Sequence, residues 1–198
     1  KNEIIHRDIK PGNILIKQNG DIDLRIIDFG LAHLIDLNDF FKRGSIVGTF
    51  AYISPEQTGF LKREVDNRSD LYSLGATFYE LLTGNPPFIE KSLGKLIYKH
   101  LAQKPIKPSD INHDIPLILD EIVLKLLNKE PDERYQSAEV LIEDLNLFLE
   151  NPDKTSSDLI HDEETKKLNI QIKITGRDDE LKILKDLFNE TANGTPKT

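Results

Sequence analysis

Residues 6 to 13 read His6-Arg7-Asp8-Ile9-Lys10-Pro11-Gly12-Asn13, and Asp28-Phe29-Gly30 follows fifteen positions after Asn13. The first segment places a carboxylate, an ammonium group and a carboxamide on one short loop. The second segment adds another carboxylate beside a glycine, the residue type that turns most freely. A carboxylate, an ammonium and two further oxygen ligands are a set of groups suited to chemistry on a charged substrate.

The residues between the two segments predict a small β-hairpin. Residues 14–17 and 24–27 are short runs of apolar and β-branched side chains, which favour strands. Gln18-Asn19-Gly20-Asp21 between them supplies turn residues. Residues 31–53 carry no sustained period, and we expect a mobile loop there.

After residue 68 the apolar residues follow a helical period. Spacings of i, i+3 and i+4 predict four helices: one beginning near Ser69 and ending at Gly84, one over 92–102, and two around 119–127 and 138–148. Ser69 is the predicted N-cap of the first helix and Gly84 its predicted stop. The predicted fold class is therefore a mainly α-helical α+β lobe with one hairpin at its edge.

Composition limits the classes of protein that fit. The 198 residues carry a net charge of −8 and contain no cysteine. The acidic balance argues against non-specific nucleic-acid binding, and no apolar run is long enough for a membrane segment. The absence of cysteine excludes disulfides and is compatible with a cytoplasmic location, which we expect. The chain also lacks methionine, and we expect it to be a fragment of a longer chain.

Three regions follow from the composition along the chain. Residues 1–150 are predicted to form the helical lobe. Residues 151–167 are polar, with few apolar anchors to offset the entropy of ordering, and are predicted to be a flexible linker. Residues 168–198 begin with alternating apolar residues and continue as an amphipathic helix after Gly176, which predicts the start of another module.

Further motifs occur in a fixed order after the first two. They are Gly48-Thr49, then Ser54-Pro55-Glu56, then Asp70 with Gly75, then Arg134. Together with His6–Asn13 and Asp28-Phe29-Gly30 they resemble the C-terminal lobe of a Ser/Thr protein kinase over about residues 1–150. Ser54 stands where the family usually has Ala, and Tyr72 where Trp is common. The resemblance implies a protein-kinase-like C-lobe with the N-lobe absent.

The resemblance implies a role for each polar residue of the two opening segments. Phosphoryl transfer needs an oriented hydroxyl, metal ions on the phosphates and positive charge on the transferring group. Asp8 would orient the substrate hydroxyl and Lys10 would stabilise the γ-phosphoryl charge. Asn13 and Asp28 would bind Mg²⁺, so that Asp8, Lys10 and Asn13 are the predicted catalytic residues and Lys10, Asn13 and Asp28 bind ATP·Mg²⁺.

Other family positions are predicted to regulate or support this site. Arg7 beside Asp8 is typical of kinases whose activation loop is switched by phosphorylation, with Ser45 the first candidate acceptor and Thr49 the second. In the family, the glutamate at Glu56 pairs with the arginine at Arg134, and this pair is expected to be buried. The carboxylate at Asp70 is expected to accept backbone N–H bonds from the catalytic loop.

A narrower resemblance concerns the whole protein. Residues 52–75 are similar to large multidomain signalling kinases, and Gly176-Arg177-Asp178-Asp179-Glu180-Leu181 resembles the start of the AAA-type ATPase module that follows the kinase in such proteins, often with a histidine kinase. An ordinary amphipathic helix after a linker is the alternative for this tail. The implied partners are a Ser/Thr protein substrate, an N-lobe and downstream ATPase and sensor domains. The alternative function is a kinase-shaped binding module, or a regulatory module of a signalling NTPase.

Overall fold

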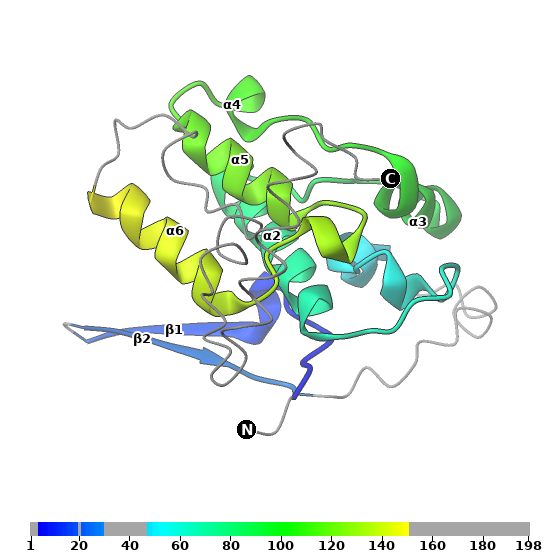
Figure 1. Ribbon diagram of the computed structural model, residues 1–198, viewed down its shortest axis with the longest axis horizontal. Helices are drawn as coiled ribbons and strands as arrows, with labels where there is room; N and C mark the ends of the chain where they lie inside the picture. The colour runs from blue at the N-terminus through cyan, green and yellow to red at the C-terminus, as the bar shows by residue number, and fades with distance from the viewer. Residues whose placement is uncertain (1–3, 20, 30–46, 151–198) are drawn as a thin grey trace, which may run out of the picture. The chain divides into compact units, whose positions relative to one another are not determined.

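A computed structural model describes residues 4–19, 21–29 and 47–150, all of which belong to one structural unit. The described part is mostly helical, with a small antiparallel sheet (Figure 1). Its strands are β1 (Ile14–Asn19) and β2 (Asp21–Ile26), and its α-helices are α2 (Asn67–Thr83), α3 (Leu93–Ala102), α4 (Pro108–Ile111), α5 (Leu117–Leu126) and α6 (Ala138–Glu150). The described part also contains four short 3₁₀ helices, which are η1 (Pro11–Asn13), η2 (Val47–Tyr52), η3 (Glu56–Thr58) and η4 (Pro131–Glu133).

The predicted hairpin is confirmed, but its strands extend further into the predicted turn: β1 includes Gln18 and Asn19, and β2 begins at Asp21 and ends before Ile27. β1 and β2 pair antiparallel, with Ile14 opposite Ile26 and Ile16 opposite Leu24. Side chains alternate between the two faces of a strand, so these four residues share one apolar face. Ile16 and Leu24 are exposed on it in the described structure.

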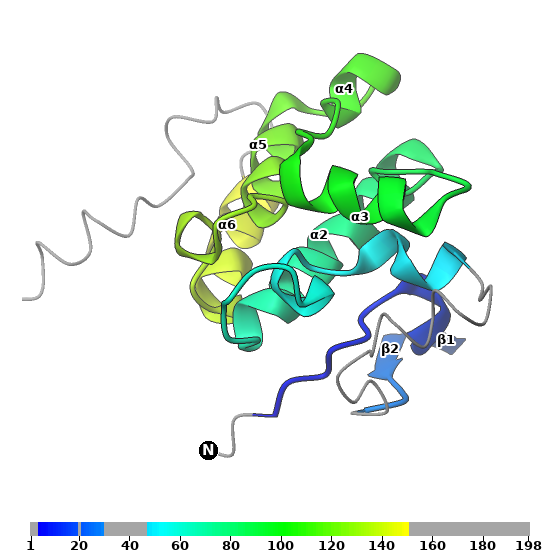
Figure 2. The same ribbon diagram turned by 90° about the vertical axis from the view of Figure 1, so that its right-hand side faces the viewer.

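Helix α2 is the centre of the helical part. It contacts both α5 and η2 and lies between them in Figure 2. The close approach to α5 occurs at Gly75, where an added Cβ would lie 2.6 Å from the Cβ of Leu126. The buried cluster around this contact contains Leu71, Ile118, Ile122, Leu126, Tyr135 and Leu141.

The two ends of α2 test the predicted caps. Gly84 adopts the left-handed conformation (φ 84°) and its N–H donates to the carbonyl of Glu80, so the predicted stop is confirmed. The predicted N-cap at Ser69 is wrong. Asp66 is the N-cap, and its carboxylate accepts the backbone N–H of Arg68 at 2.9 Å. Ser69 lies inside the first turn, where its hydroxyl donates to Glu56 instead.

Two other segments differ from the expectation. Residues 47–52, which fall in the predicted loop 31–53, form the 3₁₀ helix η2. The short helix α4 was not predicted. Pro108 is its first residue, and buried Asp120 of α5 accepts the backbone N–H and the hydroxyl hydrogen of Ser109. The predicted linker 151–167 and the module beginning at residue 168 lie outside the described residues.

Candidate active site

The carboxylate of Asp8 is bound by the two polar side chains that follow it in the same segment. Its Oδ2 accepts hydrogen bonds from Lys10 Nζ at 2.7 Å and from Asn13 Nδ2 at 2.9 Å. Asn13 Nδ2 also donates to the carbonyl of Asp8 at 2.8 Å. Asn13 is buried, whereas Asp8 and Lys10 are partly exposed. The structure therefore brings the three predicted catalytic residues together at the start of the hairpin.

The backbone before Asp8 is held by Asp70 of α2. Arg7 has a φ of 67°, in the left-handed region that non-glycine residues seldom adopt. The carboxylate of Asp70 accepts the backbone N–H groups of His6 and Arg7, each at 2.7 Å. Burial raises the pKa of Asp70, and these two hydrogen bonds offset part of that rise. The hydrogen bonds expected of Asp70 are thus present.

His6 connects this segment with the residues around Asp28. Its Nδ1 lies 3.2 Å from the backbone N–H of Asp8, which it accepts, and its Nε2 lies 2.9 Å from the carbonyl oxygen of Ile27. A ring that accepts at Nδ1 and faces a carbonyl at Nε2 carries its proton on Nε2. The ring also packs on Phe29, with centroids 4.7 Å apart. His6 is buried and serves packing and hydrogen bonding.

Asn13 and Asp28 lie at the same end of the hairpin. The backbone N–H of Ile27, next to Asp28, donates to the carbonyl of Asn13 at 2.9 Å. Asp28 is exposed and has a φ of 64°. A carboxylate and an amide oxygen are the ligand types that Mg²⁺ takes from proteins, and Mg²⁺ commonly uses one or two protein ligands with phosphate oxygens and water completing its shell. The pair fits this ion. Among the described residues no group of three or more His, Cys, Asp or Glu side chains could hold a metal.

Glu56 and Arg134 form a buried ion pair. Arg134 Nη1 and Nη2 bind the two carboxylate oxygens at 2.7 and 2.9 Å, and the side chains are 0% and 1% exposed. Ser69 donates to the same carboxylate at 2.6 Å. Burial alone would raise the pKa of Glu56, but the hydrogen bonds and charge of Arg134 lower it overall, with help from Ser69. The remaining N–H groups of Arg134 donate to backbone carbonyls of Arg68, Asn128 and Lys129.

The structure describes only part of the region that contains the two candidate phosphorylation sites, Ser45 and Thr49. Ser45 lies outside the described residues, and of Thr49 the structure describes the backbone within η2. Arg7, their predicted partner once one is phosphorylated, has a buried Nε that finds no hydrogen-bond acceptor among the described residues.

Sequence reasoning missed Gln57. Its side chain accepts hydrogen bonds from Ser54 and donates to the backbone carbonyl of Arg7. Gln57 lies fifty positions from Arg7, so no local period or spacing indicates the contact. The available signal was the serine at position 54, a buried hydroxyl that needs a partner where the family usually has alanine.

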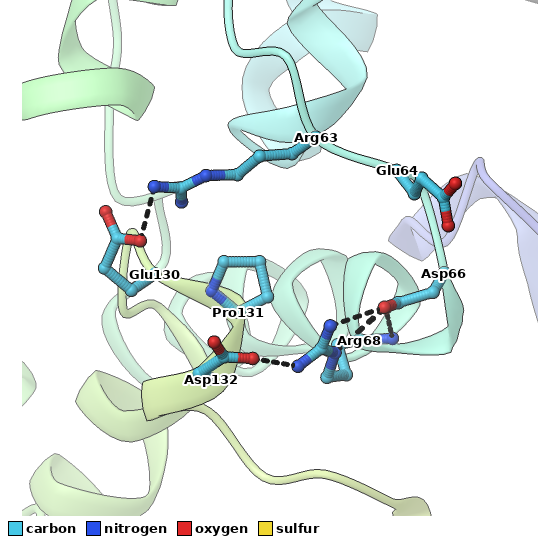
Figure 3. A pocket seen from close by; sticks show the side chains of 7 residues that line it. All are labelled: Arg63, Glu64, Asp66, Arg68, Glu130, Pro131 and Asp132. Carbon is cyan, nitrogen blue, oxygen red and sulfur yellow. Dashed lines mark hydrogen bonds and ion pairs between the residues drawn. The ribbon is translucent and has the colours of Figure 1, made fainter.

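A pocket of about 320 Å³ lies at the N-terminal end of α2 (Figure 3). None of the predicted site residues lines it. In the lining of this pocket, Arg63 pairs with Glu130, and Arg68 pairs with both Asp66 and Asp132, so both arginines are held in ion pairs. Its lining residues are Arg63, Glu64, Asp66, Arg68, Glu130, Pro131 and Asp132. We assign it no function.

Within the described ranges, no helix is long and apolar enough to span a membrane.

Comparison with known proteins agrees with this geometry. The chain is 44% identical over 146 residues to the serine/threonine-protein kinase PknB of Mycobacterium leprae, covering 73% of this chain and 23% of the relative. It is 40% identical over 157 residues to a probable serine/threonine-protein kinase of Clostridium perfringens, covering 79% and 22%. It is 48% identical over 135 residues to the hybrid signal transduction histidine kinase G of Dictyostelium discoideum, covering 68% and 4%.

The chain thus spans less than a quarter of the length of these relatives. The protein kinase domain family matches residues 1–145, which include Asp8, Lys10, Asn13 and Asp28. This match covers well over half of the sequence. The chain belongs to the protein kinase family.

Proposed function

We propose that the chain is the C-lobe part of a serine/threonine protein kinase, and that the parent protein transfers the γ-phosphoryl group of ATP to Ser or Thr hydroxyls. The observation that carries the proposal is the arrangement of Lys10 and Asn13 on the carboxylate of Asp8. The similarity to relatives named serine/threonine-protein kinases supports it.

We assign to Asp8 the role of orienting the substrate hydroxyl. Both side-chain hydrogen bonds to its carboxylate use Oδ2. Oδ1 is therefore the oxygen that we assign to accept and orient the substrate hydroxyl. The two donors also fix the rotation of the carboxylate, so the hydroxyl is presented in one direction. Alignment of the attacking oxygen is a large part of what a kinase contributes to catalysis.

We assign to Lys10 the role of stabilising the negative charge on the transferred phosphoryl group. Its ammonium group is 2.7 Å from Asp8 Oδ2, so a phosphoryl group that reaches the hydroxyl on Asp8 also meets this positive charge. Asn13 and Asp28 would hold Mg²⁺ through an amide and a carboxylate oxygen. When bound, the ion neutralises charge on the ATP phosphates.

Regulation is proposed to act through Arg7. A phosphate on Ser45, or on Thr49, would carry about −1.5 to −2 charge at pH 7 and several acceptor oxygens for a guanidinium. The buried Nε of Arg7 is a donor available for such an acceptor among the described contacts. Arg7 directly precedes Asp8, so a phosphate bound there would steady the backbone that carries the predicted catalytic carboxylate.

The wider architecture is part of the same proposal. We place residues 1–150 in the kinase C-lobe, 151–167 in a flexible linker and 168–198 at the start of an AAA-type ATPase module, in a cytoplasmic multidomain signalling protein with an N-lobe before this segment. The relative named a hybrid signal transduction histidine kinase, of which the match covers 4%, supports a long multidomain parent.

The test is phosphate incorporation by the parent protein. Purified parent is incubated with ATP and Mg²⁺, and phosphorylated residues are mapped by mass spectrometry in the wild type and in Asp8→Asn. Asp23→Asn, at an exposed position on β2, is the matched control. We expect phosphoserine or phosphothreonine with the wild type and the control, and none with Asp8→Asn. Equal incorporation by Asp8→Asn would overturn the assignment of Asp8, and no incorporation by any form would favour a binding module.

A further inference from the structure

Gln57 joins two segments that lie far apart in the sequence. Its Nε2 donates to the backbone carbonyl of Arg7 at 2.7 Å. Its Oε1 accepts the backbone N–H of Ser54 at 3.1 Å and the hydroxyl of Ser54 at 2.9 Å. One half-buried carboxamide therefore connects the residue before Asp8 with the residue that opens Ser54-Pro55-Glu56.

The orientation of this carboxamide is fixed by its partners. The carbonyl oxygen of Arg7 can only accept, so the atom facing it must be the amide nitrogen. The backbone N–H of Ser54 can only donate, so the atom facing it must be the amide oxygen. Reversal of the amide would break both contacts. The buried hydroxyl of Ser54 donates to the same oxygen and so has a hydrogen-bond partner.

Gln57 and Asp70 hold opposite ends of the Arg7 residue. Asp70 accepts the backbone N–H groups of His6 and Arg7, and Gln57 donates to the Arg7 carbonyl, which is part of the peptide leading to Asp8. The left-handed φ of 67° at Arg7 is unfavourable for a residue with a side chain and persists where neighbouring groups enforce it. Asp70 fixes the N-terminal side of this residue, and Gln57 fixes the C-terminal side.

We propose that Gln57 is a positioning residue for phosphoryl transfer, which holds the peptide between Arg7 and Asp8 so that the Asp8 carboxylate points at the substrate hydroxyl. The inference rests on the proposed kinase function. It also gives the segment around Ser54 a direct mechanical connection to Asp8. A shift of that segment moves the carboxamide, and the carboxamide moves the Arg7 carbonyl.

Two substitutions separate positioning from mere packing. Gln57→Leu removes all three side-chain hydrogen bonds at similar volume. Gln57→Glu keeps the acceptor for Ser54 but, when ionised, places a carboxylate against the Arg7 carbonyl. Once protonated, that carboxyl group regains a donor for the same carbonyl. Activity of Gln57→Glu relative to wild type should therefore rise as the pH falls, which a purely structural role would not produce. Gln103→Leu, the same change at an exposed position after α3, is the matched control.

The experiment measures kcat and KM of the parent kinase with dephosphorylated casein and ATP·Mg²⁺, with thermal melting of every variant. We expect Gln57→Leu to lower kcat about 10- to 100-fold while KM for ATP changes less than about 3-fold, the size of loss expected when a reacting group is misplaced by about 1 Å. The introduced carboxyl group is half-buried and faces the Arg7 carbonyl oxygen, and both conditions raise its pKa above the ordinary value of about 4.3. The kcat of Gln57→Glu relative to wild type should therefore rise at least about 3-fold between pH 8 and pH 6, as a growing fraction of this carboxyl group is protonated.

Each outcome bears on one of the two claims. A Gln57→Leu enzyme with wild-type kcat, beside an inactive Asp8→Asn, would overturn the role of Gln57 and leave the kinase function standing. If Gln57→Leu does not fold, the pH dependence of Gln57→Glu still decides, and a ratio that does not change with pH would overturn the proposal. Full activity of Asp8→Asn would overturn the proposed function and the role of Gln57 with it.

Discussion

Glu56→Gln should strongly destabilise the protein, because it removes the negative charge opposite a fully buried guanidinium. The side chains of Arg134 and Glu56 are 0% and 1% exposed. Glutamine is nearly the same shape, so packing is retained while the charge on Arg134 is left uncompensated. Breaking a buried ion pair in this way costs about 3–5 kcal/mol. Since native proteins are stable by about 5–15 kcal/mol, this is a large part of the total.

Equilibrium unfolding in urea measures the loss. With a slope of about 1–3 kcal/mol per molar urea, the unfolding midpoint should fall by at least about 1 M. Glu64→Gln, an exposed carboxylate nearby in sequence, is the control and should leave the midpoint almost unchanged. A Glu56→Gln midpoint equal to that of the control would refute the reasoning about buried charge.

The pH dependence gives a second test of the same pair. The folded state lowers the pKa of Glu56, because the hydrogen bonds and charge of Arg134 outweigh the effect of burial. The stability that this carboxylate provides is therefore complete above its unfolded pKa of about 4.5 and is lost as the pH falls through the lower folded pKa. The difference in stability between wild type and Glu56→Gln should shrink below about pH 4.5. A difference that stays constant down to pH 3 would contradict the assigned pKa direction.

Two further predictions concern packing and titration in the helical part. Gly75→Ala should lower the unfolding temperature by several degrees, because its Cβ would lie 2.6 Å from that of Leu126 and overpacking costs about 1–3 kcal/mol. Gly94→Ala, the control at an open helical position, should instead raise the unfolding temperature. Equal shifts in the two variants would show that the α2–α5 contact is not tight. The pKa of Lys129 is lowered to about 7, chiefly by burial and further by the charge of Arg134. Between about pH 7 and pH 10 the unfolded chain therefore holds the proton of this lysine more tightly than the folded chain does. The free energy of unfolding should rise over this range, by at most about 1.4 kcal/mol per pH unit. Urea titrations of Lys129→Met should show a flatter rise, and an unchanged slope would remove Lys129 as its source.

Local patterns predicted the parts of the fold that depend on neighbouring residues. The hairpin follows from two apolar runs around Asn19-Gly20, and the end of α2 follows from a glycine that can take a positive φ. The cluster of Asp8, Lys10 and Asn13 was also accessible, since all three lie within six consecutive residues and one loop brings them together. The hydrogen bonds of Asp70 and the Glu56–Arg134 pair were expected from the resemblance to kinases.

The wrong or missing predictions concern residues whose hydrogen-bond partner lies far away in the sequence. Ser69 has the right chemistry for an N-cap, but its hydroxyl donates to Glu56, and Asp66 caps the helix instead. The short helix α4 depends on Asp120, eleven positions beyond Ser109, which supplies acceptors that four residues cannot provide for themselves. Gln57 depends on Arg7 in the same way. Such contacts follow from the tertiary arrangement and leave no period in the sequence.

The central claim is that the carboxylate of Asp8 orients the hydroxyl that receives the phosphoryl group. A single-turnover experiment on the parent kinase tests it most directly, with ATP binding and the rate of phosphoryl transfer measured separately for wild type and Asp8→Asn. We predict that Asp8→Asn binds ATP·Mg²⁺ with an affinity within about 3-fold of wild type and transfers its phosphoryl group at least about 100-fold more slowly. A transfer rate equal to that of the wild type would contradict the account.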